Sequence, residues 1–182
     1  MSEPASALGH AAFEGFANVK EIGPLGMLSL RAQPDLPGLE AALAALGLTR
    51  PEPRRIVVSG ARSCGWMSPD EYLIVLPYGE AGPAMATLDQ NLTGTHHLVA
   101  NVSDARAVFR IEGEKAVQVL TKLMPVDFAT LAPGELRRSR AAQVAAAVWV
   151  QDGGFTLVCF RSAAGYVFRL LEHSAGPGSE LG

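Results

Sequence analysis

The stretch CGWMSPDEYLIV, residues 64–75, decides how the first half of the chain folds. Its centre, Ser68-Pro69-Asp70-Glu71, is typical of a tight turn, because Ser supplies a side-chain acceptor, Pro presets φ and Asp tolerates the bridge conformation. The same four residues also fit a capping box at the start of a helix. The run that follows, residues 72–76, is β-rich and ends at a proline, so we predict a hairpin turn between two strands rather than a helix.

Two carboxylates in this motif raise the question of acid–base catalysis. Adjacent residues of an extended chain point to opposite faces, so Asp70 and Glu71 are poorly placed to act on one substrate. We therefore interpret the motif as a structural turn, with Trp66 as a packing residue. The members of this turn motif are Trp66, Ser68, Pro69, Asp70 and Glu71.

The order of strand and helix patterns occurs twice along the chain. Each series gives a strand, a helix, a strand, a hairpin, a strand and an apolar closing segment, over about residues 26–92 and 98–171. The second closing segment, residues 165–172, fits either a strand or a helix. We therefore predict an α+β fold of two similar halves, built from antiparallel sheet and packed helices.

The segments outside this pattern are small or polar. The first has no sustained period, and the last is rich in Gly, Pro and Ser. The predicted organisation is a flexible N-terminal arm at residues 1–20, one domain at residues 21–174 with halves of about 22–95 and 96–174, and a frayed tail at residues 175–182.

Composition indicates a compact soluble protein. Apolar residues make up 48% and charged residues 18% of the chain. The formal net charge is −3, so the chain lacks the excess of basic residues that is typical of nucleic-acid-binding proteins. The N-terminus lacks the apolar core of a signal peptide, and the longest apolar stretch is too short to cross a bilayer. We therefore expect no membrane contact and a cytoplasmic location. Cys64 and Cys159 lie too far apart in sequence for a zinc ribbon or a redox motif.

Three further polar groups are candidate sites, and each has a structural alternative. His96 and His97 diverge if they lie on a strand, and no carboxylate stands at ligand spacing, so we predict no metal site. Ser103 and Asp104, followed by Arg106, suggest a triad fragment, but a polar turn explains them better because the chain has no nucleophile elbow. A basic cluster just before a predicted strand is either a solvated loop or a contact for an acidic partner. Its members are Arg137, Arg138 and Arg140.

Three segments carry a resemblance to a known family. They are PLGMLSLRA around Leu25, WMSPDEYLIV at residues 66–75, and VSDARAVFRIEGEKAVQVL at residues 102–120. Through their order and spacing, the chain resembles the gamma subunits of heterotetrameric sarcosine oxidase over about residues 22–173. The third segment is also similar to folate-binding aminomethyltransferases, which implies the fold of their folate-binding domain.

The resemblance implies that chemistry and cofactors belong to other subunits. This chain would be a non-catalytic gamma subunit without a cofactor, packed against alpha, beta and delta subunits. FAD, FMN, NAD, tetrahydrofolate and zinc are then expected in those partner subunits. The complex would oxidise sarcosine to glycine and hydrogen peroxide, with transfer of the methyl carbon to tetrahydrofolate.

Two other functions are compatible with the residues. A stand-alone folate-binding or one-carbon transfer protein requires a pterin-sized pocket lined by a buried carboxylate. A homo-oligomeric scaffold requires no enzyme partner at all. A subunit separated from its complex is expected to expose an apolar patch larger than a few hundred Å², which self-association of the isolated chain would bury.

Overall fold

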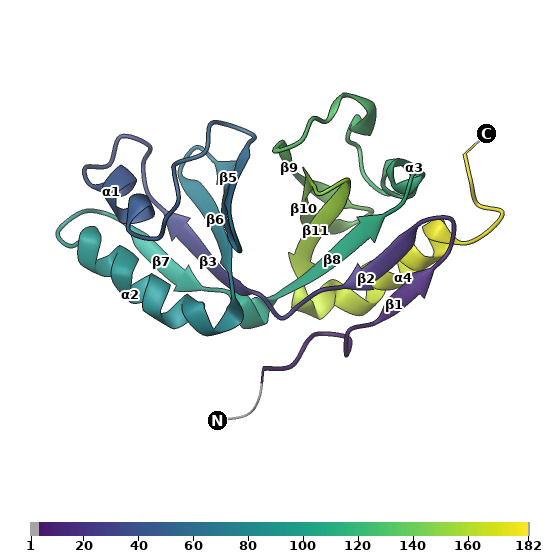
Figure 1. Ribbon diagram of the computed structural model, residues 1–182, viewed down its shortest axis with the longest axis horizontal. Coiled ribbons are helices and arrows are strands. Elements are labelled where there is room, and N and C mark those ends of the chain that lie inside the picture. Colours follow the sequence, from purple (N-terminus) through teal and green to yellow (C-terminus); the bar gives the residue numbers. More distant parts are fainter. Residues whose placement is uncertain (1–3, 182) are drawn as a thin grey trace. The chain divides into compact units, whose positions relative to one another are not determined.

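The computed structural model describes residues 4–181, and the chain divides into two compact units (Figure 1). The middle unit comprises Leu25–Asp104. The terminal unit joins the chain up to Pro24 with the chain from Ala105 onward. Residues 1–3 of the predicted arm and residue 182 of the predicted tail lie outside the described residues.

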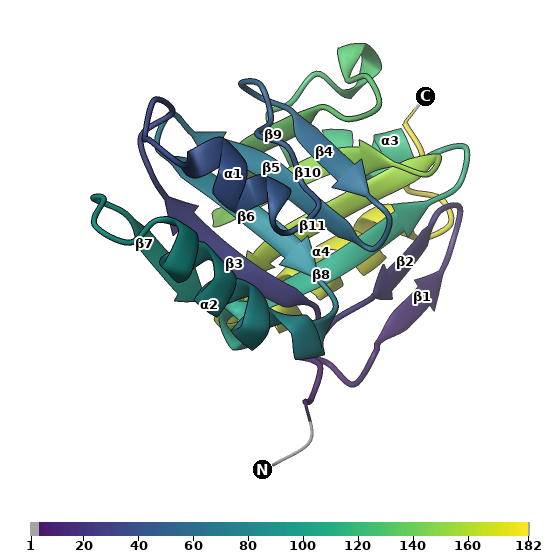
Figure 2. The same ribbon diagram turned by 60° about the vertical axis from the view of Figure 1, so that its left-hand side comes forward.

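The middle unit is an antiparallel sheet packed against two helices. The sheet order is β4-β5-β6-β3-β7, so β4 and β7 are its edges (Figure 2). A single 3-10 turn, η1 (Tyr78–Glu80), precedes the second helix. The elements are β3 (Gly26–Arg31), α1 (Leu39–Ala44), β4 (Ile56–Ser59), β5 (Arg62–Ser68), β6 (Glu71–Leu76), α2 (Ala81–Asn91) and β7 (Leu98–Asn101).

Alternate residues of the central strands face the helices and form the core of this unit. Leu28 and Leu30 of β3 and Ile74 of β6 belong to one cluster with Leu43 of α1 and Leu88 of α2, and all five are fully buried. Each side chain of this size contributes about 1.5–3 kcal/mol when it leaves water. The period-2 pattern of the strands and the helical pattern of α1 are therefore satisfied by the same cluster.

The terminal unit has a six-stranded antiparallel sheet, in the order β1-β2-β8-β11-β10-β9, and two helices. Three 3-10 turns connect its parts: η2 (Ser103–Ala105) at its boundary, η3 (Phe128–Thr130) and η4 (Arg161–Ala163). The elements are β1 (Ala12–Glu14), β2 (Asn18–Glu21), β8 (Arg106–Glu112), α3 (Ala116–Thr121), β9 (Leu136–Ala141), β10 (Val144–Gln151), β11 (Gly154–Phe160) and α4 (Ala164–Ala175).

Helix α4 settles the closing segment whose sequence fitted either a strand or a helix. Its buried residues Ala164, Val167, Leu171 and Ala175 recur every three or four positions, which is the spacing of one helical face. This face packs in a cluster with Phe109 and other residues of the sheet. The hairpin between β10 and β11 turns at Asp152 and Gly153, both at positive φ, as its Gly-rich sequence predicts.

The prediction of two similar halves is confirmed by the order of the elements. The series β3-α1-β4-β5-β6-α2 corresponds to β8-α3-β9-β10-β11-α4. The two sheets also share one strand order, β4-β5-β6-β3 in the middle unit and β9-β10-β11-β8 in the terminal unit. The fold is therefore a duplicated α+β unit.

Each sheet takes one strand from the sequence next to the other repeat: β7 lies beside β3, and β2 lies beside β8. We call β2 and β7 the exchanged strands. Strand β2 directly precedes β3 in sequence but pairs with β8, whereas β7 directly precedes β8 but pairs with β3. The boundaries between units consequently fall after Pro24 and after Asp104. The sequence places a single boundary between residues 95 and 96, because strand pairing between distant segments leaves no local pattern.

The N-terminal segment differs from the predicted flexible arm. Residues of β1 and β2 form the end of the terminal sheet, and the Glu21 carboxylate at the end of β2 is buried. Its two oxygens accept hydrogen bonds from the backbone N–H groups of Ala7, Leu8 and His10 at 2.8–3.1 Å. The Arg161 guanidinium also donates to two backbone carbonyls of the segment, at Ala5 and Ser6. The predicted arm is thus attached at several points.

The C-terminal segment differs from the predicted frayed tail in the same way. Helix α4 continues to Ala175, and the Lys122 ammonium group donates to the backbone carbonyls of Ser174 and Ser179. The N–H of Leu181 donates to Oε1 of Gln118 at 3.0 Å. Both attachments come from α3 or the residue after it, so this helix holds the chain end.

Ser103 completes the pairing of β7 with β3. The strand ends at Asn101, and the Ser103 hydroxyl oxygen accepts the N–H of buried Met27 at 2.9 Å. The hydroxyl donates in turn to the Asn101 side-chain oxygen at 2.6 Å, and Val102 N–H donates to the Met27 carbonyl. A side chain thus replaces the next backbone acceptor of the ladder, which is the polar turn that the sequence predicts here.

Replacing Ser103 by Ala removes the acceptor of the Met27 N–H, which is buried. We expect Ser103→Ala to lower the free energy of unfolding by about 1–3 kcal/mol, because a buried donor loses its partner. Urea unfolding followed by circular dichroism measures this difference. The matched control is Ser59→Ala, an exposed serine at the end of β4, which is expected to change stability by less than about 0.5 kcal/mol. Equal effects of the two substitutions would show that the Ser103 bond carries no stability.

Candidate functional site

The turn motif forms one side of a polar cluster at the end of β3. The Arg31 guanidinium lies between two carboxylates, 3.2 Å from Asp70 Oδ2 and 3.2 Å from Glu71 Oε2. The Ser68 hydroxyl donates to Asp70 Oδ1 at 2.8 Å. This hydrogen bond, ahead of the charge of Arg31, holds the pKa of the Asp70 carboxyl below its ordinary value.

The hairpin predicted for the turn motif is confirmed, but the two carboxylates do not diverge. Strand β5 ends at Ser68 and β6 begins at Glu71, so Asp70 lies in the turn rather than in extended chain. The turn therefore lets both acids reach the same Arg31. The guanidinium is about half exposed, and exposed ion pairs of this kind contribute up to about 1 kcal/mol. These ion pairs hold the turn against β3, and both carboxylates are occupied by Arg31.

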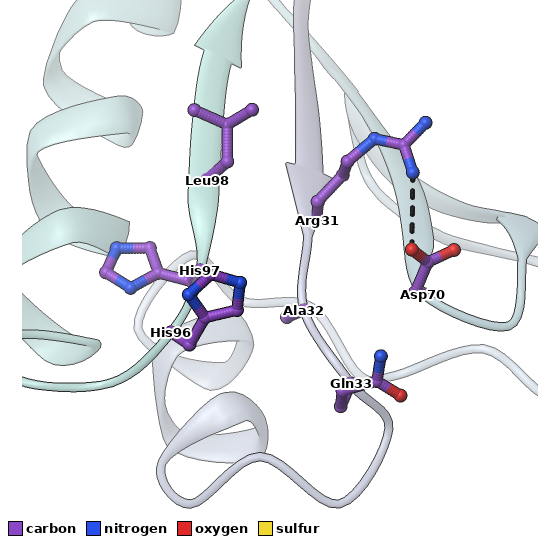
Figure 3. Close-up of a pocket in the computed structure, with 7 residues that line it drawn as sticks. All are labelled: Arg31, Ala32, Gln33, Asp70, His96, His97 and Leu98. Atoms are coloured by element: carbon purple, nitrogen blue, oxygen red, sulfur yellow. Dashed lines mark hydrogen bonds and ion pairs between the residues drawn. The ribbon is translucent and has the colours of Figure 1, made fainter.

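A hollow of about 310 Å³ lies beside this cluster (Figure 3). Leu98 opposes Arg31 in the register of β7 and β3, so their side chains share one face of the sheet. Val99 instead packs toward the cluster that contains the helices, so Leu98 and Arg31 lie on the opposite face. The residues that line the hollow are Arg31, Ala32, Gln33, Asp70, His96, His97 and Leu98.

The two neighbouring histidines point to different sides of the chain (Figure 3). His97 Nε2 lies 3.3 Å from Asp89 Oδ1 of α2, and its Nδ1 lies 3.1 Å from the Thr95 carbonyl oxygen. His96 is exposed at the hollow. Within residues 4–181, no group of three or more His, Cys, Asp or Glu side chains is arranged to hold a metal ion.

The residues that suggested a triad fragment have separate structural partners. The Ser103 hydroxyl is engaged with Met27 and Asn101, as described above. Asp104 Oδ1 accepts the Tyr78 hydroxyl at 2.8 Å. The Arg106 guanidinium lies 4.1 Å from the centre of the Phe160 ring, a cation–π contact on the terminal sheet.

The basic cluster lies within a strand rather than in a loop before one. Arg137, Arg138 and Arg140 belong to β9, the edge of the terminal sheet beyond β10. Arg137 pairs with Glu135 at 3.3 Å. Arg138 and Arg140 are exposed residues of the strand. Charged side chains are a common feature of edge strands, because they discourage pairing with other chains. A contact of these arginines with an acidic partner stays a prediction.

Tyr72 has a buried hydroxyl that sequence reasoning missed. The residue is 1% exposed, and its Oη has no hydrogen-bond partner among the described residues. Burial raises the pKa of the Tyr72 phenol, and the neighbouring Arg50 opposes this rise without hydrogen-bonding geometry to Oη. The β-rich run that predicts strand β6 contains no signal that would distinguish a paired hydroxyl from an unpaired one.

Replacing Tyr72 by Phe removes a polar atom that lacks a partner. We expect Tyr72→Phe to leave the melting temperature unchanged or to raise it, because the cost of burying the hydroxyl disappears. Tyr78→Phe is the comparison, since it removes a hydroxyl that donates to Asp104, and it should not stabilise the chain. Differential scanning calorimetry of both variants gives the answer. A clear loss of stability in Tyr72→Phe alone would mean that its hydroxyl has a partner in solution.

Both cysteines are buried single thiols. Burial raises the pKa of Cys64 to about 12 and that of Cys159 to about 11, with the Glu40 carboxylate adding to the rise at Cys64 and Arg106 opposing it at Cys159. A thiol reacts as the thiolate, and at neutral pH these groups are protonated. The two side chains therefore act as small apolar residues of their cores.

The protected thiols give a direct chemical prediction. At about pH 8, close to the ordinary thiol pKa of about 8.5, the folded chain should react with a thiol reagent such as Ellman's reagent far more slowly than a free cysteine. After unfolding in guanidinium chloride, both thiols should react promptly. Spectrophotometric counting of thiols before and after unfolding measures this. Rapid labelling of Cys64 in the folded chain would contradict the burial described.

Comparison with solved structures defines the class of fold. The chain matches glycine cleavage system aminomethyltransferase T from Bartonella henselae with a TM-score of 0.64 and 15% identity, over 83% of this chain and 44% of the other. It matches a chain of heterotetrameric sarcosine oxidase from Corynebacterium sp. U-96 with a TM-score of 0.82 and 23% identity, over 94% and 90% of the two chains. The duplicated α+β unit is therefore of the kind found in aminomethyltransferase T.

The sequence identifies the family. The family described as "Sarcosine oxidase, gamma subunit family" matches residues 31–176. A relative from Arthrobacter sp, named sarcosine oxidase subunit gamma, is 32% identical over 127 residues, which is 68% of this chain. The chain belongs to the sarcosine oxidase gamma subunit family, as its three motif segments indicated. The match spans 61% of the length of the Arthrobacter relative.

Proposed function

We propose that this chain is the non-catalytic gamma subunit of a cytoplasmic sarcosine oxidase complex. It packs against alpha, beta and delta subunits, which hold the nicotinamide and flavin groups, tetrahydrofolate and zinc. The complex demethylates sarcosine oxidatively to glycine and transfers the methyl carbon to tetrahydrofolate. Family membership over residues 31–176 is the observation that carries this proposal.

The engagement of the chain's own polar side chains supports a structural role. Asp70 and Glu71 hold Arg31, and the Ser103 hydroxyl holds Met27 in the β3–β7 ladder. The two thiols are buried with raised pKa values. The two carboxylates and the Ser103 hydroxyl are thus used to hold strands together, and the thiols are packed in the apolar clusters. Among residues 4–181, no helix is long and apolar enough to span a membrane.

The positions of the carboxylates give less support to the alternative function, a stand-alone folate-binding protein. Glu21 is the one fully buried carboxylate within residues 4–181, and its oxygens already accept backbone N–H groups. Asp70, at the hollow, is 42% exposed and engaged with Arg31 and Ser68. Neither acid has the buried and unengaged position needed to grip a pterin.

The proposal is tested by purifying the affinity-tagged chain from its own host. We expect flavin-containing subunits to co-purify in fixed proportion and the purified material to produce hydrogen peroxide when sarcosine is added. The chain produced alone should give no peroxide, and the untagged host serves as the background control. Oxidation of sarcosine by the isolated chain, or elution without any flavin-containing subunit, would contradict the proposal.

Calorimetry separates the folate alternative. Tetrahydrofolate titrated into the isolated chain should give no binding heat, and the ligand should not raise the melting temperature, because a ligand stabilises only a state that binds it. A saturable heat together with a dose-dependent rise in melting temperature would instead favour a folate-binding protein. The same titration into the co-purified complex is the positive control.

A further inference from the structure

The internal duplication leaves one strand position open in the middle unit. In the terminal sheet, the exchanged strand β2 is followed on its outer side by β1, which pairs with it in antiparallel register. In the middle sheet, the exchanged strand β7 is the last strand, with none described beyond it (Figure 2). The other ends of the two sheets, β4 and β9, are both edges, so the duplication singles out the position beside β7.

The backbone of β7 presents hydrogen-bonding groups to this open position. Val102 N–H donates to the Met27 carbonyl, and the register pairs Val99 with Leu30 and Ala100 with Ser29. Residue pairs of antiparallel strands alternate between hydrogen-bonded and non-hydrogen-bonded. Because Val102 is hydrogen-bonded to β3, Ala100, two positions before it, also directs its N–H and C=O to β3. Val99 and Asn101 therefore direct theirs away from β3. An added strand would find these groups in place.

The side chains of β7 do not protect this edge. The strand is Leu-Val-Ala-Asn, without the charged residues or prolines that discourage edge pairing. Leu98 is 57% exposed and stands at the rim of the hollow that Arg31 and His96 also line. In contrast, the β9 edge carries three arginines. The open edge at β7 is thus uncharged and carries an exposed apolar side chain, that of Leu98.

We infer that β7 takes up an extended strand from a partner subunit, in the position that β1 occupies beside β2. This inference rests on the proposed function, because the occupant belongs to the same complex. The added strand runs antiparallel to β7, as β1 does to β2, and is itself uncharged and apolar opposite Leu98. Backbone hydrogen bonds to Val99 and Asn101 supply affinity, and the contact with Leu98 supplies selectivity.

Two kinds of variant at β7 test the inference, each with a control at the opposite edge. Val99→Pro removes an outward N–H, and Leu98→Lys places a charge on the exposed side chain. The matched position on the edge strand β4 is Val58, which is 51% exposed. The Trp66 N–H donates to the Arg55 carbonyl, and in the register of β4 with β5 this places the N–H of Val58 on the side away from β5. Val58→Pro and Val58→Lys are therefore the matched controls. Circular dichroism of each isolated variant checks that it folds.

The measurement is co-assembly of each variant with the other subunits of its complex, produced in the same cells. We expect Leu98→Lys and Val99→Pro to weaken assembly on the order of tenfold or more, and the Val58 variants to assemble like the unaltered chain. Hydrogen–deuterium exchange of the unaltered complex adds a second readout that needs no variant. Peptides covering β7 should exchange more slowly in the complex than in the isolated chain, and peptides covering β4 should not.

The outcomes separate this inference from the proposed function. If the unaltered chain does not assemble with flavin-containing subunits, the proposed function fails and the inference falls with it. If the unaltered chain assembles but the β7 variants do so equally well and β7 gains no protection, the inference alone is overturned. Dimers of the isolated chain that Leu98→Lys abolishes, with assembly unaffected, would assign the position to a second copy and also overturn it.

Discussion

The fold depends on two exchanged strands, β2 and β7. Each completes the sheet built mainly by the other repeat, through backbone bonds to β8 or β3. The paired residues of β2 and β8 lie 88–94 positions apart in sequence, and those of β7 and β3 lie 67–73 positions apart. The loop-closure entropy of each pairing must therefore be offset by the strand ladder and by the core beneath it. The Ser103 hydroxyl fastens the end of β7 to β3. The Glu21 carboxylate at the end of β2 instead holds the N-terminal segment before β1 through three backbone N–H groups.

Other polar side chains hold strand ends and the chain end in place. Arg31 between two acids holds the β5–β6 turn to β3, and Lys122, directly after α3, binds both the last turn of α4 and the chain end beyond it. The individual exposed ion pairs are weak, so the stability of each unit rests on its apolar cluster, and the polar contacts set which strand ends meet. These contacts are consistent with the structural role proposed above for this member of the sarcosine oxidase gamma subunit family.

Local features could be predicted from the sequence because their causes are local. The turn at Pro69 and Asp70, the hairpin at Asp152 and Gly153, and the helix face around Leu43 follow from residue types within a few positions. The duplication could also be predicted, because the same order of strand and helix patterns occurs twice along the sequence.

Strand β9 was missed because its arginines have the composition of a solvated loop, although charge is usual at a sheet edge. Strands β1 and β2 are three and four residues long, and only their pairing partners make them strands. Arg31 could not be joined to Asp70 and Glu71 in advance, because that contact requires the register of β3 with β6.

The exchange of strands is measured most directly by nuclear Overhauser effects between α-protons. In the non-hydrogen-bonded residue pairs of antiparallel strands, the two Cα atoms lie about 4.5 Å apart, so their α-protons give a strong nuclear Overhauser effect. The structure places Val19 opposite Ile111 and Leu30 opposite Val99 in such pairs, so strong effects are expected between these residues. Effects that instead connect β2 with β3 and β7 with β8 would contradict the exchange, and with it the open position beside β7.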